Sequence, residues 1–178
     1  MNLLIPLTIL TLAFGLPLAA DGAAPHVGVD VKISNKADFK DIKGSSSKTK
    51  TQSRILTTTL SNFGKDAVPD VQVKWWIFGH NMKDHGLIIL KQGESKVVVP
   101  ARGSVEVSSP EVTVTGTREH NVSTRSGRGK RSRTSTKEVP ASGQEYYGYA
   151  VEVVSGSTRI AAKYSNPSIE KELSPRKN

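Results

Sequence analysis

The feature that most constrains this chain is an alternation of apolar and polar side chains with a period of two. It is clearest in residues 71–78, where every second side chain is aliphatic or Trp: Val71, Val73, Trp75 and Ile77. Successive side chains of a β-strand point to opposite faces of its sheet. The run therefore predicts a strand with these four side chains on its buried face.

Similar short runs recur along the chain with turn residues between them. We expect strands in residues 26–34, 51–61, 71–78, 87–90, 97–99, 105–107, 112–114, 147–153 and 159–164, with Tyr147 and Tyr149 on one face with Val151 and Val153. Gln92-Gly93 is expected to divide two of these strands, Pro110 to mark an edge or bulge, and Asn166-Pro167 to end the sheet. Residues 36–50 are interpreted as an irregular hairpin. Outside the first twenty residues, no stretch of ten or more has apolar positions at helical spacing, so the pattern predicts an all-β sandwich or barrel.

Residues 1–20 carry no charged side chain and are rich in Leu, Ile and Ala, as in the apolar region of an export signal. Ala19 and Ala20 are small residues at an expected cleavage point. The prediction is a signal peptide at 1–20 and one domain at 21–178, in the periplasm or outside the cell. The alternative is an uncleaved N-terminal anchor, since a spanning helix uses roughly 17–25 residues.

The absence of Cys excludes disulfides, thiol chemistry and thiolate zinc sites. In an exported chain this composition favours a bacterial envelope. The fold must then be stabilised by burial of apolar surface alone.

The positive charge is concentrated in one segment. The chain has a formal net charge of +9, and residues 118–137 hold seven basic side chains: Arg118, Arg125, Arg128, Lys130, Arg131, Arg133 and Lys137. Glu119 and Glu138 are the acidic residues beside them. The Ser, Thr and Gly content of residues 117–138 predicts an exposed loop that is disordered without a partner.

Clustered Arg side chains can bind phosphate, sulfate or carboxylate groups through their planar fork of donors. The predicted polyanion-binding residues are Arg125, Arg128, Lys130, Arg131 and Arg133. The alternative interpretation is a solvated loop without a ligand, and it is favoured by the absence of interleaved aromatic residues.

Two segments resemble known export modules. Residues 60–67, with Asn62-Phe63-Gly64 before the strand at 71–76, and residues 148–153, followed by a turn at Gly156, resemble bacterial immunoglobulin-like and fibronectin-III-like modules, including the CARDB type. The resemblance implies an immunoglobulin-like β-sandwich of about seven to nine antiparallel strands. It implies a binding, adhesive or spacer role, places Trp75 in the core, and carries over no functional residue.

No catalytic residue, metal site or cofactor is predicted. His80 and His85, with Asp84 between them, share one expected loop, and imidazole and carboxylate groups are ordinary zinc ligands. Nothing in the sequence fixes a third ligand, so the preferred interpretation is that these are turn residues. Trp76, Phe78 and Tyr146 are expected opposite the core, either as an aromatic binding surface or covered by other elements.

The expected function is that of a secreted, non-catalytic binding or structural module of the cell envelope or extracellular space. Its expected partner is a protein or glycan at the cell surface. The alternative is a polyanion-binding protein that uses the basic segment on an acidic glycan, a lipid head group or nucleic acid. An enzyme is the least favoured class, because no nucleophile, base and orienting group form a recognisable set.

Overall fold

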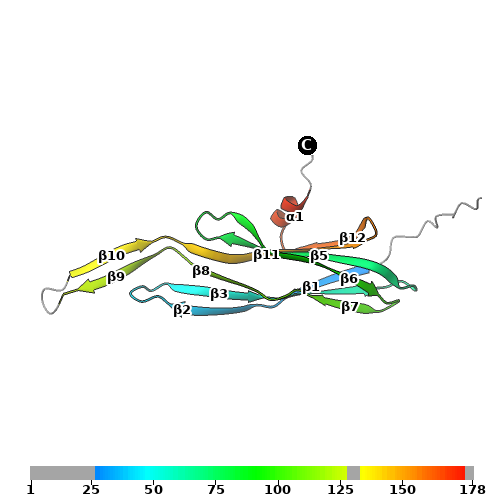
Figure 1. Cartoon of the computed structure of the whole chain (residues 1–178), viewed down its shortest axis with the longest axis horizontal. Coiled ribbons are helices and arrows are strands. Elements are labelled where there is room, and N and C mark those ends of the chain that lie inside the picture. Colours follow the sequence, from blue (N-terminus) through cyan, green and yellow to red (C-terminus); the bar gives the residue numbers. More distant parts are fainter. Residues whose placement is uncertain (1–26, 128–132, 175–178) are drawn as a thin grey trace, which may run out of the picture.

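The computed structural model describes residues 27–127 and 133–174, which form an all-β sandwich with one short helix (Figure 1). The strands are β1 (Val27–Ile33), β2 (Lys36–Asp41), β3 (Lys48–Arg54), β4 (Leu56–Asn62), β5 (Val68–Asn81), β6 (Leu87–Val99), β7 (Ser104–Ser108), β8 (Val112–Thr117), β9 (His120–Ser126), β10 (Arg133–Val139), β11 (Ser142–Ser155) and β12 (Thr158–Tyr164). The helix is α1 (Pro167–Leu173). The all-β prediction is confirmed, and the expected signal peptide lies outside the described residues.

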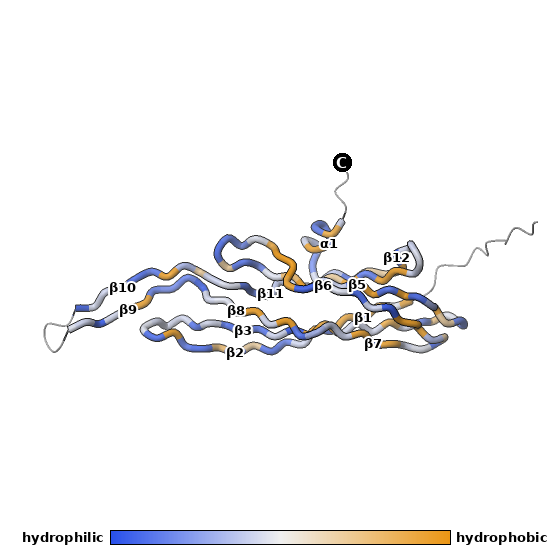
Figure 2. The backbone as a smooth tube through the Cα atoms, in the orientation of Figure 1, coloured by the Kyte–Doolittle hydropathy of each residue, from blue (hydrophilic) through white to orange (hydrophobic). Residues whose placement is uncertain are grey.

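The strands pair antiparallel in two sheets and a separate hairpin. One sheet has the order β1-β4-β7, and the other has the order β2-β3-β8-β11-β5-β6 with β12 also paired to β11. The hairpin is β9–β10. Between the sheets lies a core in which Leu60, Val71, Val73, Ile77, Val99, Val151 and Val153 are fully buried. Apolar residues gather in this part of the molecule in Figure 2, and the predicted inner face of β5 is confirmed.

Three strands of the first sheet bend at one level and continue into the second sheet. The breaks are two residues between β1 and β2, one between β3 and β4, and three between β7 and β8. At this level Ser34 Oγ accepts a hydrogen bond from the Ile55 amide (2.8 Å), and Ser109 Oγ accepts one from the Leu56 amide (3.0 Å). These hydroxyls replace carbonyl acceptors where the ladder is interrupted, so the backbone stays paired through the bend.

The bends correct the predicted strand boundaries. The strand expected over residues 51–61 is two strands, and Pro110 lies in the break between β7 and β8, where no ladder N–H is required. The described residues hold twelve strands, more than the seven to nine expected. The excess arises because each bent strand is divided in two.

The break expected at Gln92-Gly93 does not exist, because β6 runs unbroken through both residues. Gly93 pairs with Trp75 of β5. A Cβ at position 93 would lie 2.4 Å from Trp75 Cζ2, so only Gly leaves room for the indole ring. This glycine therefore marks close packing within a strand.

The expected common face of Tyr147 and Tyr149 is also wrong. A bulge in β11 leaves Tyr147 outside the register with β5, since Tyr146 pairs with Gly79 and Gly148 with Phe78. One extra residue moves the following side chains to the opposite face. Tyr149 packs against the main core, while Tyr147 packs on the outer side with Phe78 and Ile169.

Helix α1 covers the outer side of β5 and β11. The Asn166 side chain accepts hydrogen bonds from the amides of Ser168 (3.1 Å) and Ile169 (3.2 Å), and Pro167 occupies the first turn. Asn-Pro thus starts a helix here, where the sequence predicted only the end of the sheet. Ile169 is fully buried against Phe78 and Ala150.

Candidate binding site at the root of the β9–β10 arm

The basic segment is a projecting β-hairpin, here called the arm, made of β9 and β10. It extends beyond the sandwich at the left of Figure 1, and its residues from Ser123 to Ser126 and from Arg133 to Glu138 are exposed. The loop predicted for this segment is therefore corrected to paired strands over residues 120–126 and 133–139. At ~3.4 Å per residue, seven residues give an arm of roughly 24 Å.

Residue type explains why these strands form despite their charge. The arm is rich in Thr, Ser and Val, and β-branched side chains favour extended backbone. Arg125 lies opposite Thr134, whereas Arg133 and Lys137 lie on the other face, opposite Ser126 and Val122. The cations are thus spread over both faces of the ribbon, which reduces their mutual repulsion.

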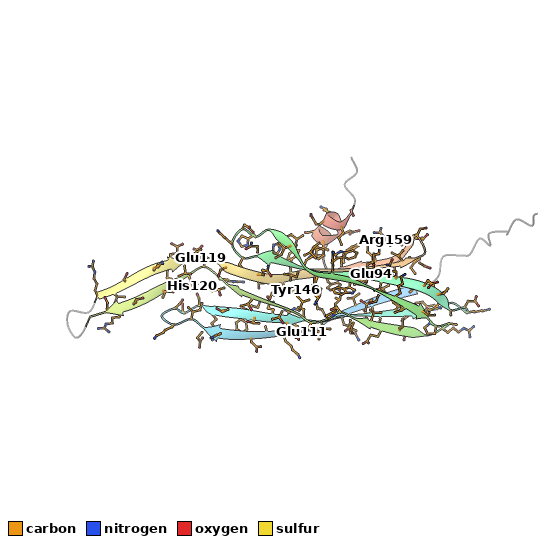
Figure 3. The ribbon with its side chains drawn as sticks, in the orientation of Figure 1. Glu94, Glu111, Glu119, His120, Tyr146 and Arg159 are labelled. Carbon is orange, nitrogen blue, oxygen red and sulfur yellow. The ribbon has the colours of Figure 1, made fainter. Side chains whose placement is uncertain are left out.

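The structure places Arg125 and Arg133 of the predicted polyanion-binding residues near the end of the arm. Arg128, Lys130 and Arg131 lie outside the described residues. Figure 3 shows Glu119 and His120 at the root of the arm, with Tyr146 closer to the sandwich.

The turn between β2 and β3 supports the arm. Ser123 donates a backbone hydrogen bond to the Gly44 carbonyl (2.9 Å). Gly44 has a φ of 77°, and a Cβ there would lie 2.8 Å from the Ser123 carbonyl oxygen. Since a two-stranded ribbon alone is marginally stable, this contact helps to hold the arm beside the β2–β3 hairpin.

An open cleft of about 470 Å³, here called the first cleft, lies between the β2–β3 hairpin and the start of β11. Its lining includes Phe39, Lys48, Lys50, Gln52, Met82, Arg118, Gln144 and Glu145. Phe39, Lys50 and Gly116 stand side by side on β2, β3 and β8, so one face of these three strands forms a wall. This volume lies within the ~300–1,000 Å³ range of small-molecule sites.

Two contacts join the walls of the first cleft. Lys50 Nζ lies 2.9 Å from Glu145 Oε1, with both side chains about one third exposed. Gln52, which is 5% exposed, accepts a hydrogen bond from the Tyr146 amide through Oε1 (3.3 Å). These contacts tie β3 to β11 across the cleft.

A second cleft of about 450 Å³ adjoins the first and shares Met82, Arg118 and Glu145 with it. It also reaches Glu119 and Pro140 at the root of the arm. The linings of the two clefts together contain four Lys and Arg residues and two Glu: Lys48, Lys50, Lys83, Arg118, Glu119 and Glu145. The surface at the root of the arm is therefore positively charged, like the arm itself.

A buried cation lies beside the clefts. Arg54 is 6% exposed, its Nη1 donates to the carbonyls of Lys36 (2.9 Å) and Ser53 (3.0 Å), and its guanidinium lies 4.9 Å from the centroid of the Tyr146 ring. Burial raises the pKa of Tyr146 to about 12, against the opposing effect of the Arg54 charge. The phenol is therefore neutral at physiological pH.

The His80, Asp84 and His85 residues form turn contacts. His80 Nδ1 is hydrogen-bonded to the His85 carbonyl (2.8 Å), and its ring packs edge-on to Tyr147 at 4.1 Å. Asp84 Oδ1 accepts from the Gly86 amide (2.9 Å). In residues 27–127 and 133–174, no three His, Asp or Glu side chains gather as a metal-ligating group.

The three aromatic residues expected opposite the core do not form one surface. Phe78 is 1% exposed under α1, Trp76 packs beside it, and Tyr146 packs against the main core. Phe78 is therefore covered by another element, which is one of the two expected outcomes. Tyr146 lies on the core side of β11, so its expected position opposite the core is wrong.

Sequence reasoning missed the residues of the first cleft, above all Phe39, Lys50 and Glu145. Phe39 and Lys50 were within a segment interpreted only as an irregular hairpin, and Glu145 is 95 residues from Lys50. A local signal existed in Phe39, an aromatic residue among charged neighbours, but its partners depend on strand pairing.

Comparisons with known proteins leave the family open. No family model matches the chain, and no curated protein matches it. Among solved structures, a Northeast Structural Genomics Consortium target is 10% identical with a TM-score of 0.31, covering 66% of this chain and 84% of its own. A protein from Akkermansia muciniphila is 12% identical with a TM-score of 0.29, covering 85% and 78%. Similarity at this level carries no assignment of function. In the described ranges no helix is both long and apolar enough to span a membrane.

Proposed function

We propose that this chain is a secreted, non-catalytic binding module of the cell envelope or extracellular space, with an immunoglobulin-like sandwich that holds an acidic glycan on its arm. The observation that carries the proposal is the exposed arm, which concentrates positive charge away from the body of the domain. Arg side chains bind carboxylate and sulfate groups through a planar fork of N–H donors.

An acidic glycan is favoured over the other polyanions by the residues of the arm. Neither β9 nor β10 contains Phe, Tyr or Trp, the side chains on which single-stranded bases stack. Residues 127–132 contain no apolar side chain that would insert into a membrane interface. Nucleic acid and lipid are therefore alternatives that the experiment distinguishes.

The test is retention on immobilised heparin, a sulfated glycan, with DNA and anionic vesicles as competitors. Replacing Arg125, Arg128, Lys130, Arg131 and Arg133 with Ser should abolish retention at low salt. A control variant removes five exposed cations elsewhere: Lys65, Lys91, Lys96, Arg102 and Lys171. Because both variants lose five positive charges, equal losses of retention would contradict the proposal and indicate an effect of net charge alone.

A further inference from the structure

We infer that the first cleft binds one acidic sugar ring, a hexuronate or a sulfated hexose, of the glycan held by the arm. This inference rests on the proposed function and adds a site that recognises the sugar itself. It is carried by three groups that meet in the cleft: an exposed aromatic ring, a set of cations, and a carboxylate with Gln52 and Gln144 beside it.

The aromatic ring is that of Phe39. It is 61% exposed on β2, and it lines the first cleft together with Met82, which is 8% exposed. The ring therefore gives the otherwise polar cleft an apolar surface that is accessible to a ligand. The C–H groups on one face of a pyranose ring give an apolar surface that packs on such a wall.

The cations bind the acidic group of the sugar. An ammonium has three N–H donors, and the contact of Lys50 with Glu145 at 2.9 Å uses one of them. Arg118 lines both clefts and supplies a planar fork that fits carboxylate and sulfate oxygens. Lys48 lies at the same wall with Asp41 at 3.2 Å, so its charge is partly compensated there.

Neutral and acidic polar groups complete the recognition of a sugar. Glu145 is an acceptor for a sugar hydroxyl, and Gln144 adds polar groups to the lining beside it. A bare polyanion such as polyphosphate has neither an apolar face nor hydroxyl donors. The first cleft therefore distinguishes an acidic sugar from other anions, whereas the arm attracts both.

The position of the cleft links it to the arm. Arg118 is two residues before β9, and the second cleft continues from Met82 and Arg118 to Pro140, next to β10. A linear glycan lying on the arm would thus reach the first cleft along a positively charged path. One sugar ring bound in the first cleft fixes the position of a glycan that the arm holds through its charge.

The experiment compares binding of a fluorescent oligogalacturonate and of inorganic polyphosphate to the full chain. Phe39→Ala should weaken binding of oligogalacturonate by about tenfold, the loss expected for one aromatic packing contact, and leave polyphosphate binding unchanged. Phe63→Ala is the matched control, because Phe63 is also exposed, at 73%, but lies in the turn after β4. The two variants should have wild-type circular dichroism and thermal midpoints, since both side chains are on the surface.

The outcomes separate this inference from the proposed function. If Phe39→Ala binds oligogalacturonate like wild type while the arm variant does not, the inference is wrong and the arm proposal stands. If wild type binds neither probe at low salt, the proposed function fails and the cleft has no anionic ligand of this kind. Equal losses in Phe39→Ala and Phe63→Ala would also overturn the inference.

Discussion

Gly143 and Thr115 approach so closely that no other residue fits at position 143. Gly143 has a φ of 85°, and a Cβ there would meet the Thr115 carbonyl oxygen at 2.1 Å. The same glycine pairs with Gly116 of β8, and its carbonyl accepts from the Met82 amide (2.9 Å). Gly143 therefore joins the start of β11 to β8 and to the turn after β5, beside Gly116 and Met82 of the first cleft.

Gly143→Ala is expected to be much more damaging than Gly156→Ala. Both glycines have a positive φ, but nothing lies within 4 Å of a Cβ at Gly156. Gly156→Ala should cost ~1 kcal/mol for backbone strain alone, and Gly143→Ala roughly 2 kcal/mol more for the steric clash. Chemical denaturation of both variants measures this difference. Equal losses of unfolding free energy in the two variants would show that the backbone around Gly143 relaxes to accommodate a methyl group.

Gly93→Ala should displace the Trp75 ring. The steric conflict with Cζ2 at 2.4 Å lies in a packed core, where overpacking costs about 1–3 kcal/mol. Tryptophan emission should shift to longer wavelength as Trp75, which is 6% exposed, gains contact with water. Lys96→Ala, at an exposed position of β6 that pairs with Gln72, should leave emission and stability unchanged. An unshifted spectrum in Gly93→Ala would contradict the packing described for β5 and β6.

Asn62→Ala should destabilise the end of the sandwich opposite the arm. The Asn62 side chain is buried, donates to the carbonyls of Asp66 (2.8 Å) and Pro100 (3.1 Å), and accepts from the Gly64 amide (2.8 Å). Loss of these bonds in a buried site should lower the free energy of unfolding by ~2–3 kcal/mol. Asn35→Ala, at an exposed position, is the control. A change within ~0.5 kcal/mol would show that water replaces the amide at no cost.

The domain should lose stability in strongly alkaline solution. Burial raises the pKa of Tyr146 and of Tyr164 from 10.0 to about 12, and the hydrogen bond from the Tyr164 hydroxyl to Glu152 adds to the second shift. Because the folded-state pKa is the higher one, the stabilisation is fully present below pH 10 and is lost as pH rises through about 12. Tyr146→Phe should flatten this dependence in urea unfolding. If tyrosinate absorbance of the folded wild type is complete near pH 10, the burial of both phenols is refuted.

The sequence predicted the parts of the fold that depend on local pattern. Alternation of Val71, Val73 and Ile77 identified the buried face of β5, and Ser155-Gly156 identified a hairpin turn. The bulge at Tyr147 and the role of Gly93 were not predictable, because each depends on a partner strand. A period-two pattern gives the faces of one strand but not its register with another.

The candidate site was predicted only in its charge. Arg125 and Arg133 were identified from clustering, yet their placement on a paired ribbon follows from β propensity that outweighs charge repulsion. The first cleft depends on Phe39, Lys50 and Glu145, which come together through pairing of β2 with β3 and of β8 with both β3 and β11. No local pattern encodes such a set.

The most direct test of acidic-glycan binding at the arm and its root is hydrogen–deuterium exchange with saturating oligogalacturonate. The account predicts slower exchange in peptides that cover residues 36–52 and 117–145, which include the arm and the first cleft, and no change in β1, β6 or β12. In the arm variant this protection should disappear. Protection confined to β6 or β12, or the same protection in wild type and the arm variant, would contradict the account.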